Sequence, residues 1–502
     1  MAVSEANRAD DDSLPRRARE LPVGEAFAPR AVVERAADGV AFVAGLEGVA
    51  YGELVAFDSG TLGMAYDLRA DTTGVLLLTD PDRVGAGQGV RGLGRPPEVP
   101  VGPSILGRII DPVGRPLDDG DALSGPRLPL FRPAPELIAR KSVDQPLWTG
   151  VSVIDAAIPI GRGQRELVIG DRNVGKTALA IDLVTAQRKG DVACVYVVIA
   201  QPMSRILGLR DTIARAGCLD NTTIVAAHAS VTPGMRYLAP YAGASVAEWF
   251  RDQGGHALVI YDDLTKHADA YRELALLLDR PPGREAYPGD VFYIHAELLE
   301  RAAARRDDAG GGSVTAIPLV ETTGSDVAAY IPTNVISITD GQIYLDATRF
   351  ERGLRPAVDV GRSVSRIGGA AQPEPMRLVA RDLRVLHARF EQLDALVRVG
   401  LEVGPEVQRE IVRGRLLRQL LQQDRISPRS PAEQVIALQA LAAGWLDGVL
   451  PAAARAAVEA LVVRARTQLP ALVAALDAGV VPEGAWQAAL GALADPGGRE
   501  ES

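Results

Sequence analysis

The residues most able to carry out chemistry form one glycine-flanked run that ends in a lysine and a threonine: Gly170-Asp171-Arg172-Asn173-Val174-Gly175-Lys176-Thr177. This run fits GxxxxGK followed by Ser or Thr, the pattern of a loop that binds nucleotide phosphates. Its glycines let the backbone turn tightly, so that N–H groups can face phosphate oxygens at the start of a helix. We expect Lys176 to meet the β- and γ-phosphates and the Thr177 hydroxyl to ligate Mg²⁺.

The segments on either side of this loop favour the same interpretation. Residues 166–169 have the pattern of a short buried strand, and residues 177 to about 189 have the pattern of a helix. A strand before the loop and a helix after it are what the phosphate-binding arrangement requires, so a chance glycine turn is the weaker alternative.

A second apolar strand ends in two carboxylates. The run Val259-Ile260-Tyr261 is followed by Asp262 and Asp263. A carboxylate at a strand end beside a phosphate loop can hold the water shell of Mg²⁺, and Asp262 is the predicted residue. A pair of solvated acids that merely ends the strand is the alternative.

The tip of another strand, Ile199-Ala200-Gln201-Pro202-Met203-Ser204, carries no acid. Hydrolysis of a nucleotide needs a group that orients water and accepts its proton. Gln201 can bind water but cannot accept a proton at neutral pH. The sequence therefore predicts a site that binds nucleotide more than it hydrolyses it. Another carboxylate, elsewhere in the sequence, could still do this work.

The chain divides into four predicted segments. Residues 1–26 are polar and are expected to be a mobile tail, and residues 27–95 carry short apolar runs between turns, the pattern of a β-barrel. Residues 96–372 alternate continuous apolar strands with helical segments, as a covered parallel sheet requires. Residues 373–502 show apolar residues at helical spacing and predict a helical bundle. The predicted fold is thus a multidomain α/β protein with a central phosphate-loop domain.

Composition narrows the class of protein further. The formal net charge is −10 with no strongly basic block, which argues against tight binding of nucleic acid. No run of about 18 apolar residues is present to span a bilayer. The first residues lack the apolar core of a signal peptide, so none is expected. The two cysteines, Cys194 and Cys218, are expected to be buried thiols in a reducing compartment.

Long blocks of sequence resemble one family. They are residues 142–146, 158–167, 237–243, 280–293, 329–342 and 363–372. Through them the chain resembles the α subunit of F-type ATP synthases over roughly residues 30 to 450. The resemblance implies a β-barrel, a RecA-like nucleotide domain and a helical domain. It also implies an alternating α₃β₃ hexamer around a central γ subunit, with a peripheral stalk.

The same resemblance implies a location and a cofactor. The α site would hold ATP or ADP with Mg²⁺ without hydrolysing it. The complex would couple ATP synthesis or hydrolysis to proton or sodium translocation at the cytoplasmic face of the bacterial inner membrane. The chain itself would be peripheral, with membrane contact only through the ion-translocating sector.

Several site residues follow from matched positions in these blocks. Arg366 matches the arginine that reaches into the neighbouring β site, and Ser363 matches a serine that helps to hold its loop. Arg355 and Pro356 match the adenine-side contact, and Gln423 matches one of two glutamines near the adenine. The second glutamine position is Arg425 here.

Other departures concern the loops and the N-terminus. Gln201 is followed by Pro202 and Met203 where a Gln-Lys-Arg-like run is usual, and Asn173-Val174 stand where Gln-Thr is common. The first 25 or so residues show no amphipathic helix of the kind that docks a peripheral-stalk subunit. These departures suggest a divergent paralogue of the alternate, sodium- or proton-coupled complexes.

Two other functions share this core. A catalytic ring ATPase of the export or flagellar type would need a carboxylate at the position of Gln201. A hexameric RNA helicase would need stacking aromatics and basic loops in the barrel. Residues 31–95 offer aromatics but no lysine and few arginines, which disfavours the helicase.

Overall fold

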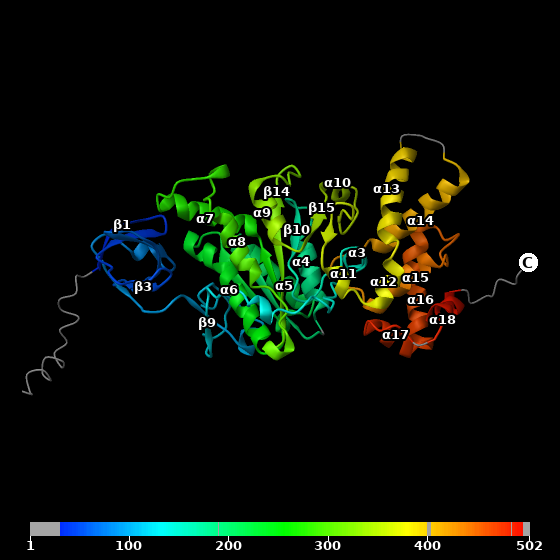
Figure 1. The fold of residues 1–502 in the computed structure, drawn as a ribbon, viewed down its shortest axis with the longest axis horizontal. Coiled ribbons are helices and arrows are strands. Elements are labelled where there is room, and N and C mark those ends of the chain that lie inside the picture. The colour runs from blue at the N-terminus through cyan, green and yellow to red at the C-terminus, as the bar shows by residue number, and fades with distance from the viewer. Residues whose placement is uncertain (1–30, 189, 399–402, 483, 495–502) are drawn as a thin grey trace, which may run out of the picture. The chain divides into compact units, whose positions relative to one another are not determined.

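The computed structural model describes residues 31–188, 190–398, 403–482 and 484–494, so the predicted tail at 1–26 lies outside the described residues. The chain forms two compact units, one that ends at Pro96 and one that begins at Pro97. Figure 1 shows the first unit in blue and the second in cyan to red. Each unit is described by itself.

The first unit is a closed β-barrel with strand order β1-β2-β5-β4-β3-β6. Each pair of neighbours is antiparallel, and apolar side chains such as Val43, Val55 and Val75 fill the interior. The barrel predicted from the spacing of short apolar runs is confirmed. Its strands are β1 (Ala31–Ala37), β2 (Val40–Ala44), β3 (Leu54–Phe57), β4 (Leu62–Leu68), β5 (Thr72–Leu77) and β6 (Gly89–Gly92).

The second unit is built on an eight-stranded sheet of order β16-β15-β10-β14-β13-β11-β12-β8. All neighbours are parallel except β16, which is antiparallel to β15. The predicted parallel-sheet domain is confirmed. The strands are β8 (Ile109–Ile110), β10 (Glu166–Asp171), β11 (Val192–Gln201), β12 (Thr222–His228), β13 (His256–Asp262), β14 (Ser313–Thr322), β15 (Gly341–Leu345) and β16 (Val364–Ser365).

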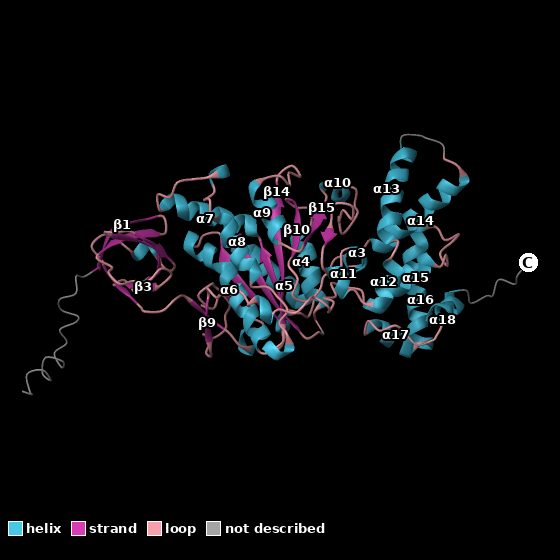
Figure 2. Cartoon of the chain, viewed as in Figure 1, coloured by secondary structure: helices cyan, strands magenta, loops and turns pink. Residues whose placement is uncertain are grey.

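Helices cover this sheet on both faces (Figure 2). The connections from β10 to β11 and from β11 to β12 run in one direction across the sheet, and the later ones run back. Because such crossovers are right-handed, the helices that follow β10 and β11 share one face of the sheet. The helices in the connections after β12, β13 and β14 share the other face. The helices are α3 (Ser152–Ala157), α4 (Lys176–Ala186), α5 (Met203–Arg215), α6 (Pro233–Asp252), α7 (Leu264–Leu277), α8 (Val291–Glu300), α9 (Tyr330–Ile338), α10 (Ala347–Glu351) and α11 (Gly368–Ala371).

The C-terminal part of the second unit is helical, as predicted (Figure 1). Its apolar residues, such as Leu416, Ile436 and Leu461, share one continuous core with α3 and α4. Among the described residues, no helix is both long enough and apolar enough to cross a membrane. The helices are α12 (Glu374–Ala380), α13 (Leu383–Arg398), α14 (Pro405–Leu421), α15 (Pro431–Ala442), α16 (Ala454–Gln468), α17 (Pro470–Asp477) and α18 (Trp486–Ala494).

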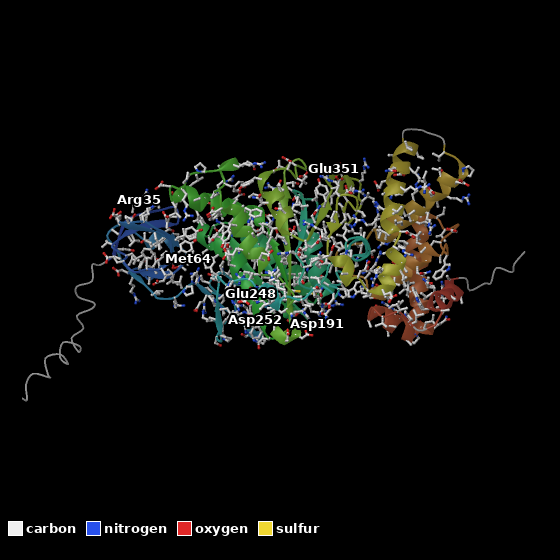
Figure 3. All side chains as sticks on the ribbon, in the orientation of Figure 1. Arg35, Met64, Asp191, Glu248, Asp252 and Glu351 are labelled. Atoms are coloured by element: carbon white, nitrogen blue, oxygen red, sulfur yellow. The ribbon has the colours of Figure 1, made fainter. Side chains whose placement is uncertain are left out.

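A buried ion network fixes the segment that leads into the sheet. Arg301 is 2% exposed, and its guanidinium donates to both oxygens of Glu248, at 3.0 and 2.8 Å, and to the carbonyl of Leu130 at 2.7 Å. Arg132 adds bonds to Glu248 and Asp252 on α6, both labelled in Figure 3. A paired, hydrogen-bonded arrangement of this kind is what a buried charge requires.

The two cysteines are free thiols in the interior of the second unit. Cys194 and Cys218 are each 1% exposed, as expected from the sequence. Burial raises the pKa of both thiols, so the reactive thiolate is disfavoured at neutral pH.

Candidate nucleotide site

The predicted phosphate loop connects β10 to α4 at the carboxyl edge of the sheet. Gly175 is the residue that precedes α4 and has φ = 103°, a left-handed conformation that an L side chain would strain. Asn173 also has a positive φ, of 64°. The loop thus curls back before the helix begins, and it leaves the first N–H groups of α4 without helical partners for an anion to meet.

Lys176 is held across the mouth of this loop. Its ammonium donates to the carbonyl oxygens of Gly170 at 2.8 Å and Asp171 at 2.6 Å. An ammonium has three donors, so one remains for a phosphate oxygen. Burial lowers the pKa of Lys176. Contact with an anion would favour the charged form of this lysine.

Asp171 anchors the loop to the neighbouring strand. Its carboxylate accepts hydrogen bonds from the hydroxyl of Thr322 at 2.6 Å and from the N–H and hydroxyl of Ser325 at 2.8 and 2.9 Å. Burial alone would raise the pKa of Asp171, but these hydrogen bonds hold the pKa below its usual value. Asp171 therefore serves the loop as an anchor.

The two residues predicted to ligate Mg²⁺, Thr177 at the start of α4 and Asp262 at the end of β13, are hydrogen-bonded to each other. The Thr177 hydroxyl donates to Oδ2 of Asp262 at 2.9 Å, and the hydroxyl of buried Tyr196 donates to the same oxygen at 2.9 Å. A hydroxyl and a carboxylate beside a phosphate loop are the oxygen ligands that Mg²⁺ takes with substrate phosphates and water. The donor set of the site therefore fits this ion.

Gln201 occupies the tip of β11 and lines the same cavity as Lys176 and Asp262. The pairing of β11 with β12 shifts register between Ile199 and Gln201, and Ala200 between them has φ = 52°. This bulge sets the direction in which the tip of the strand leaves the sheet. The alternation of side chains along a strand does not predict such a change of direction. The tip carries no carboxylate, as the sequence indicated.

Three carboxylates that line the cavity were not singled out from the sequence: Asp182, Glu321 and Asp424. Glu321 lies near the end of β14, the strand between β10 and β13, and it lines the cavity. Arg172 of the phosphate loop donates to its Oε1 at 2.9 Å. The signal was available, because Glu321 follows an apolar strand just as Asp262 does. The hypothesis that the site is catalytic requires a carboxylate elsewhere in the sequence than Gln201, and Glu321 is a residue of that kind.

The predicted base-side residues lie at the other end of the cavity, which has a volume of about 970 Å³. The guanidinium of Arg355 lies 5.0 Å from the centre of the Phe350 ring, and Pro356 follows it. Gln423 also lines this end, but its amide donates to the carbonyls of Gly150 at 2.6 Å and Ser427 at 2.7 Å. Gln423 thus braces the wall of the cavity through the protein's own backbone.

Arg366 lies at the opposite, amino edge of the sheet, whereas Ser363 lies farther along β15, beside Tyr344. Ser365 pairs with Gly341 of β15, which in turn pairs with Glu166 at the start of β10, whereas the phosphate loop follows the end of β10. The strand has six residues and spans about 20 Å between these edges. Arg366 is exposed and does not line the cavity.

The loop that carries Arg366 is fixed by its neighbours. The backbone N–H of Arg366 donates to the carbonyl of Asp340 at 2.9 Å, and its guanidinium donates to the carbonyl of Ile336 at 2.9 Å. Ser363 is fully buried, and its hydroxyl donates to the carbonyl of Asp359 at 2.6 Å and accepts from the N–H of Tyr344 at 2.9 Å. These two bonds tie Ser363 to its neighbouring segments, and the role expected from its matched position stays a prediction.

A buried carboxyl group also lies at this edge. Glu166 is fully buried, and its Oε2 accepts from the amide of Gln164 at 2.7 Å, which also donates to the hydroxyl of Ser365 at 3.0 Å. Gly341 makes room for it, because a Cβ there would come within 2.6 Å of a Glu166 oxygen. Burial raises the pKa of Glu166 well above its usual range.

Comparison with known proteins identifies the family. The nucleotide-binding domain of the ATP synthase alpha/beta family matches residues 150–365, and its C-terminal domain matches residues 372–493. The chain therefore belongs to the ATP synthase alpha/beta family, within its alpha-subunit branch.

The relatives are similar along most of their length. The chain is 50% identical to ATP synthase subunit alpha 2 of Syntrophotalea carbinolica, over 84% of this chain and 82% of the relative. It is 50% identical to ATP synthase subunit alpha of Aquifex aeolicus, over 83% of each chain. It is 52% identical to ATP synthase subunit alpha 2 of Burkholderia thailandensis, over 84% of this chain and 76% of the relative.

Proposed function

We propose that the chain is the non-catalytic, nucleotide-binding α subunit of a rotary F-type ATP synthase or ATPase. It binds ATP or ADP with Mg²⁺ at the phosphate loop and supplies Arg366 to the catalytic site of a neighbouring β subunit. The observation that carries this proposal is the separation of these features at opposite ends of β10. An arginine at the amino edge lies too far from the phosphate loop of its own chain to contact a phosphate there.

The nucleotide half of the proposal is supported by the convergence of three groups on one cavity. Lys176 contacts the phosphates with its remaining donor, and the helix start of α4 adds backbone N–H groups. Thr177 and Asp262 hold Mg²⁺, which when bound neutralises charge on the β- and γ-phosphates. Phe350, Arg355 and Pro356 line the base side of the cavity.

The lack of turnover follows from what surrounds the terminal phosphate. Gln201 cannot take a proton from water at neutral pH. Glu321 is a carboxylate, but the guanidinium of Arg172 occupies one of its oxygens at 2.9 Å. The site therefore retains nucleotide and orients water poorly for attack.

The assembly follows from the proposed role of Arg366. The chain alternates with β subunits in an α₃β₃ hexamer around a γ subunit, with a peripheral stalk. The complex lies at the cytoplasmic face of the bacterial inner membrane and couples ATP synthesis or hydrolysis to movement of protons or sodium ions. Nucleic acid has no part in this function.

One observation favours a second candidate, a catalytic ring ATPase of the same superfamily. Glu321 lies in the cavity and could accept a proton if Arg172 released it. In that case the isolated chain would hydrolyse ATP.

The test is nucleotide binding and phosphate release by the purified full chain. We expect it to bind MgATP with negligible turnover, and we expect Lys176→Ala to weaken binding by about 100-fold, the scale of lost charge-assisted hydrogen bonds. Rapid turnover that is abolished by both Lys176→Ala and Glu321→Gln would replace this proposal with the ring ATPase.

A further inference from the structure

Arg205 is a cation in the candidate site that the sequence reasoning did not single out. It lies in the first turn of α5, one turn beyond Gln201, and lines the same cavity as Lys176 and Asp262. Its side chain makes no hydrogen bond or ion pair with any other residue in the described part of the chain. Because Arg205 is exposed and borders the cavity without a protein partner, its guanidinium is available to a ligand in that cavity.

The topology places Arg205 at the end of the cavity away from the base. Along the carboxyl edge, the strand tips run from β10 through β14 and β13 to β11. The base-side residues Phe350 and Arg355 follow β15, which lies on the other side of β10. A nucleotide whose base lies beside Arg355 and whose phosphates lie on the loop therefore extends its terminal phosphate toward β11 and α5.

The other cations at this end already have partners. Arg172 pairs with Glu321 at 2.9 Å, and Lys266 pairs with Asp263 at 2.9 Å. Lys176 already donates two hydrogen bonds to carbonyls of the phosphate loop. A third phosphate brings additional negative charge to this end of the cavity, and Arg205 has its guanidinium available to meet it.

The start of α5 adds to the positive potential around Arg205. The residue before the helix is Pro202, and no side chain caps the first N–H groups. The positive end of the helix dipole therefore faces the same end of the cavity as the guanidinium.

We infer that Arg205 contacts the terminal phosphate of a bound nucleoside triphosphate and makes this site prefer triphosphates over diphosphates. The guanidinium fork donates to two oxygens of the terminal phosphate, a pairing for which arginine is suited. Arg205 is thus a specificity-determining residue. This inference rests on the nucleotide site of the proposed function.

The test is the binding of MgATP and MgADP to the full chain by equilibrium titration. We expect Arg205→Gln to raise the Kd for MgATP by about 10-fold to 100-fold and the Kd for MgADP by about 3-fold or less, because only the triphosphate reaches this residue. Arg205→Lys keeps the charge without the fork and should recover part of the difference. Arg210→Gln is the matched control, since Arg210 lies on the same helix but not on the cavity.

Three outcomes separate this inference from the proposed function. A selective loss for MgATP, absent in the Arg210 control, supports the inference. An equal loss for both nucleotides, or no loss for either, overturns it. If Lys176→Ala also leaves both affinities unchanged, the nucleotide site itself has failed and the proposed function falls with the inference.

Discussion

At the carboxyl edge of the sheet, Lys176, Thr177 and Asp262 bond to the phosphate loop or to one another, and all three line one cavity. At the amino edge, Arg366 is fixed through its backbone and one carbonyl, yet it is exposed and lies outside that cavity. The first edge is organised for a ligand that lies against this chain. Under the proposed function, the second edge acts on a target in a neighbouring subunit.

On the proposed function, this difference separates residues that bind nucleotide from a residue that acts on a neighbouring subunit. A side chain whose neighbours converge on a cavity is expected to change the affinity of its own chain for nucleotide. A side chain that is braced at an exposed edge is expected to change the rate of an assembly without changing that affinity. Variants at the two edges should therefore give opposite profiles.

The largest effect is expected at Arg366. In a complex assembled with wild-type β subunits, Arg366→Ala should lower multi-site ATP hydrolysis by about 10³-fold or more, the scale of a lost arginine finger. Arg366→Lys should rescue poorly, because lysine lacks the planar fork. The affinity of the chain's own site for MgATP should not change. Steady-state hydrolysis and a binding titration on the same preparations measure both quantities.

The control for this variant is Arg362→Ala. Arg362 is a neighbouring exposed arginine whose guanidinium lies 3.6 Å from the centre of the Tyr344 ring. Near-normal turnover of the Arg366→Ala complex, with assembly verified, would leave this subunit only a structural role.

The reverse profile is expected at Lys176. In an assembled complex, Lys176→Ala should leave hydrolysis within about 10-fold of the wild type, although it weakens nucleotide binding to this chain by about 100-fold. The reason is that the proposed function assigns hydrolysis to the β subunits. Nucleotide content of the purified complex and its steady-state rate are the measurements. Complete loss of hydrolysis in a correctly assembled complex would contradict the separation of the two edges.

The segment from Thr149 to Ile160 joins the two edges, and its stability should depend on pH through Asp155. The carboxylate of Asp155 accepts from the N–H and hydroxyl of Thr149 at 2.9 and 2.7 Å and from the amide of Gln434 at 2.7 Å. At one end of the segment, the carbonyl of Gly150 accepts from the amide of Gln423. At the other end, the carbonyl of Pro159 accepts from the hydroxyl of Ser365.

Burial raises the pKa of Asp155 from 3.8 to about 6 despite these donors. A raised folded-state pKa contributes stability that is full below the unfolded pKa and is lost as pH rises through about 6. The free energy of unfolding of the wild type relative to Asp155→Asn should therefore fall by up to about 3 kcal/mol between about pH 4 and pH 7. Urea unfolding of both proteins across this range is the measurement. A difference that stays constant with pH would show that Asp155 does not titrate there.

The smallest effect is expected at Ser363. Ser363→Ala leaves the N–H of Tyr344 without its buried acceptor, while the carbonyl of Asp359 keeps the backbone N–H of residue 363 at 3.0 Å, so the change should lower the free energy of unfolding by about 1–3 kcal/mol. In the assembled complex it should lower hydrolysis by about 10-fold, since Arg366 is then less well positioned. Ser337→Ala, at an exposed serine of α9, is the control. Unchanged hydrolysis with lowered stability would limit Ser363 to folding.

The sequence predicted those parts of the site that depend on a strand end or a fixed spacing. The phosphate loop has a spacing that only a tight turn before a helix satisfies, and Asp262 ends an apolar strand. The barrel and the parallel sheet follow from turn spacing and from continuous apolar runs. Each of these signals is local, so it can be read without knowledge of the fold.

Features that depend on contacts between distant segments could not be predicted in this way. The bonds from the Gln423 amide to Gly150 and Ser427 depend on how the segment after α14 lies against the residues that precede α3. The edge on which Arg366 lies depends on the two-residue strand β16, which is too short to carry a pattern. Arg205 lies on an exposed turn of α5, and only the fold shows that this turn borders the cavity.

The two buried cysteines have a practical consequence for spectroscopy. The whole chain contains two thiols, and both are buried with raised pKa values, so they should react slowly with maleimide reagents. A single cysteine introduced at an exposed position near either edge would then carry the label, with the native residues left in place. Fluorescence or electron paramagnetic resonance could then measure the distance between labels on different copies of the chain in the assembly, for each edge in turn.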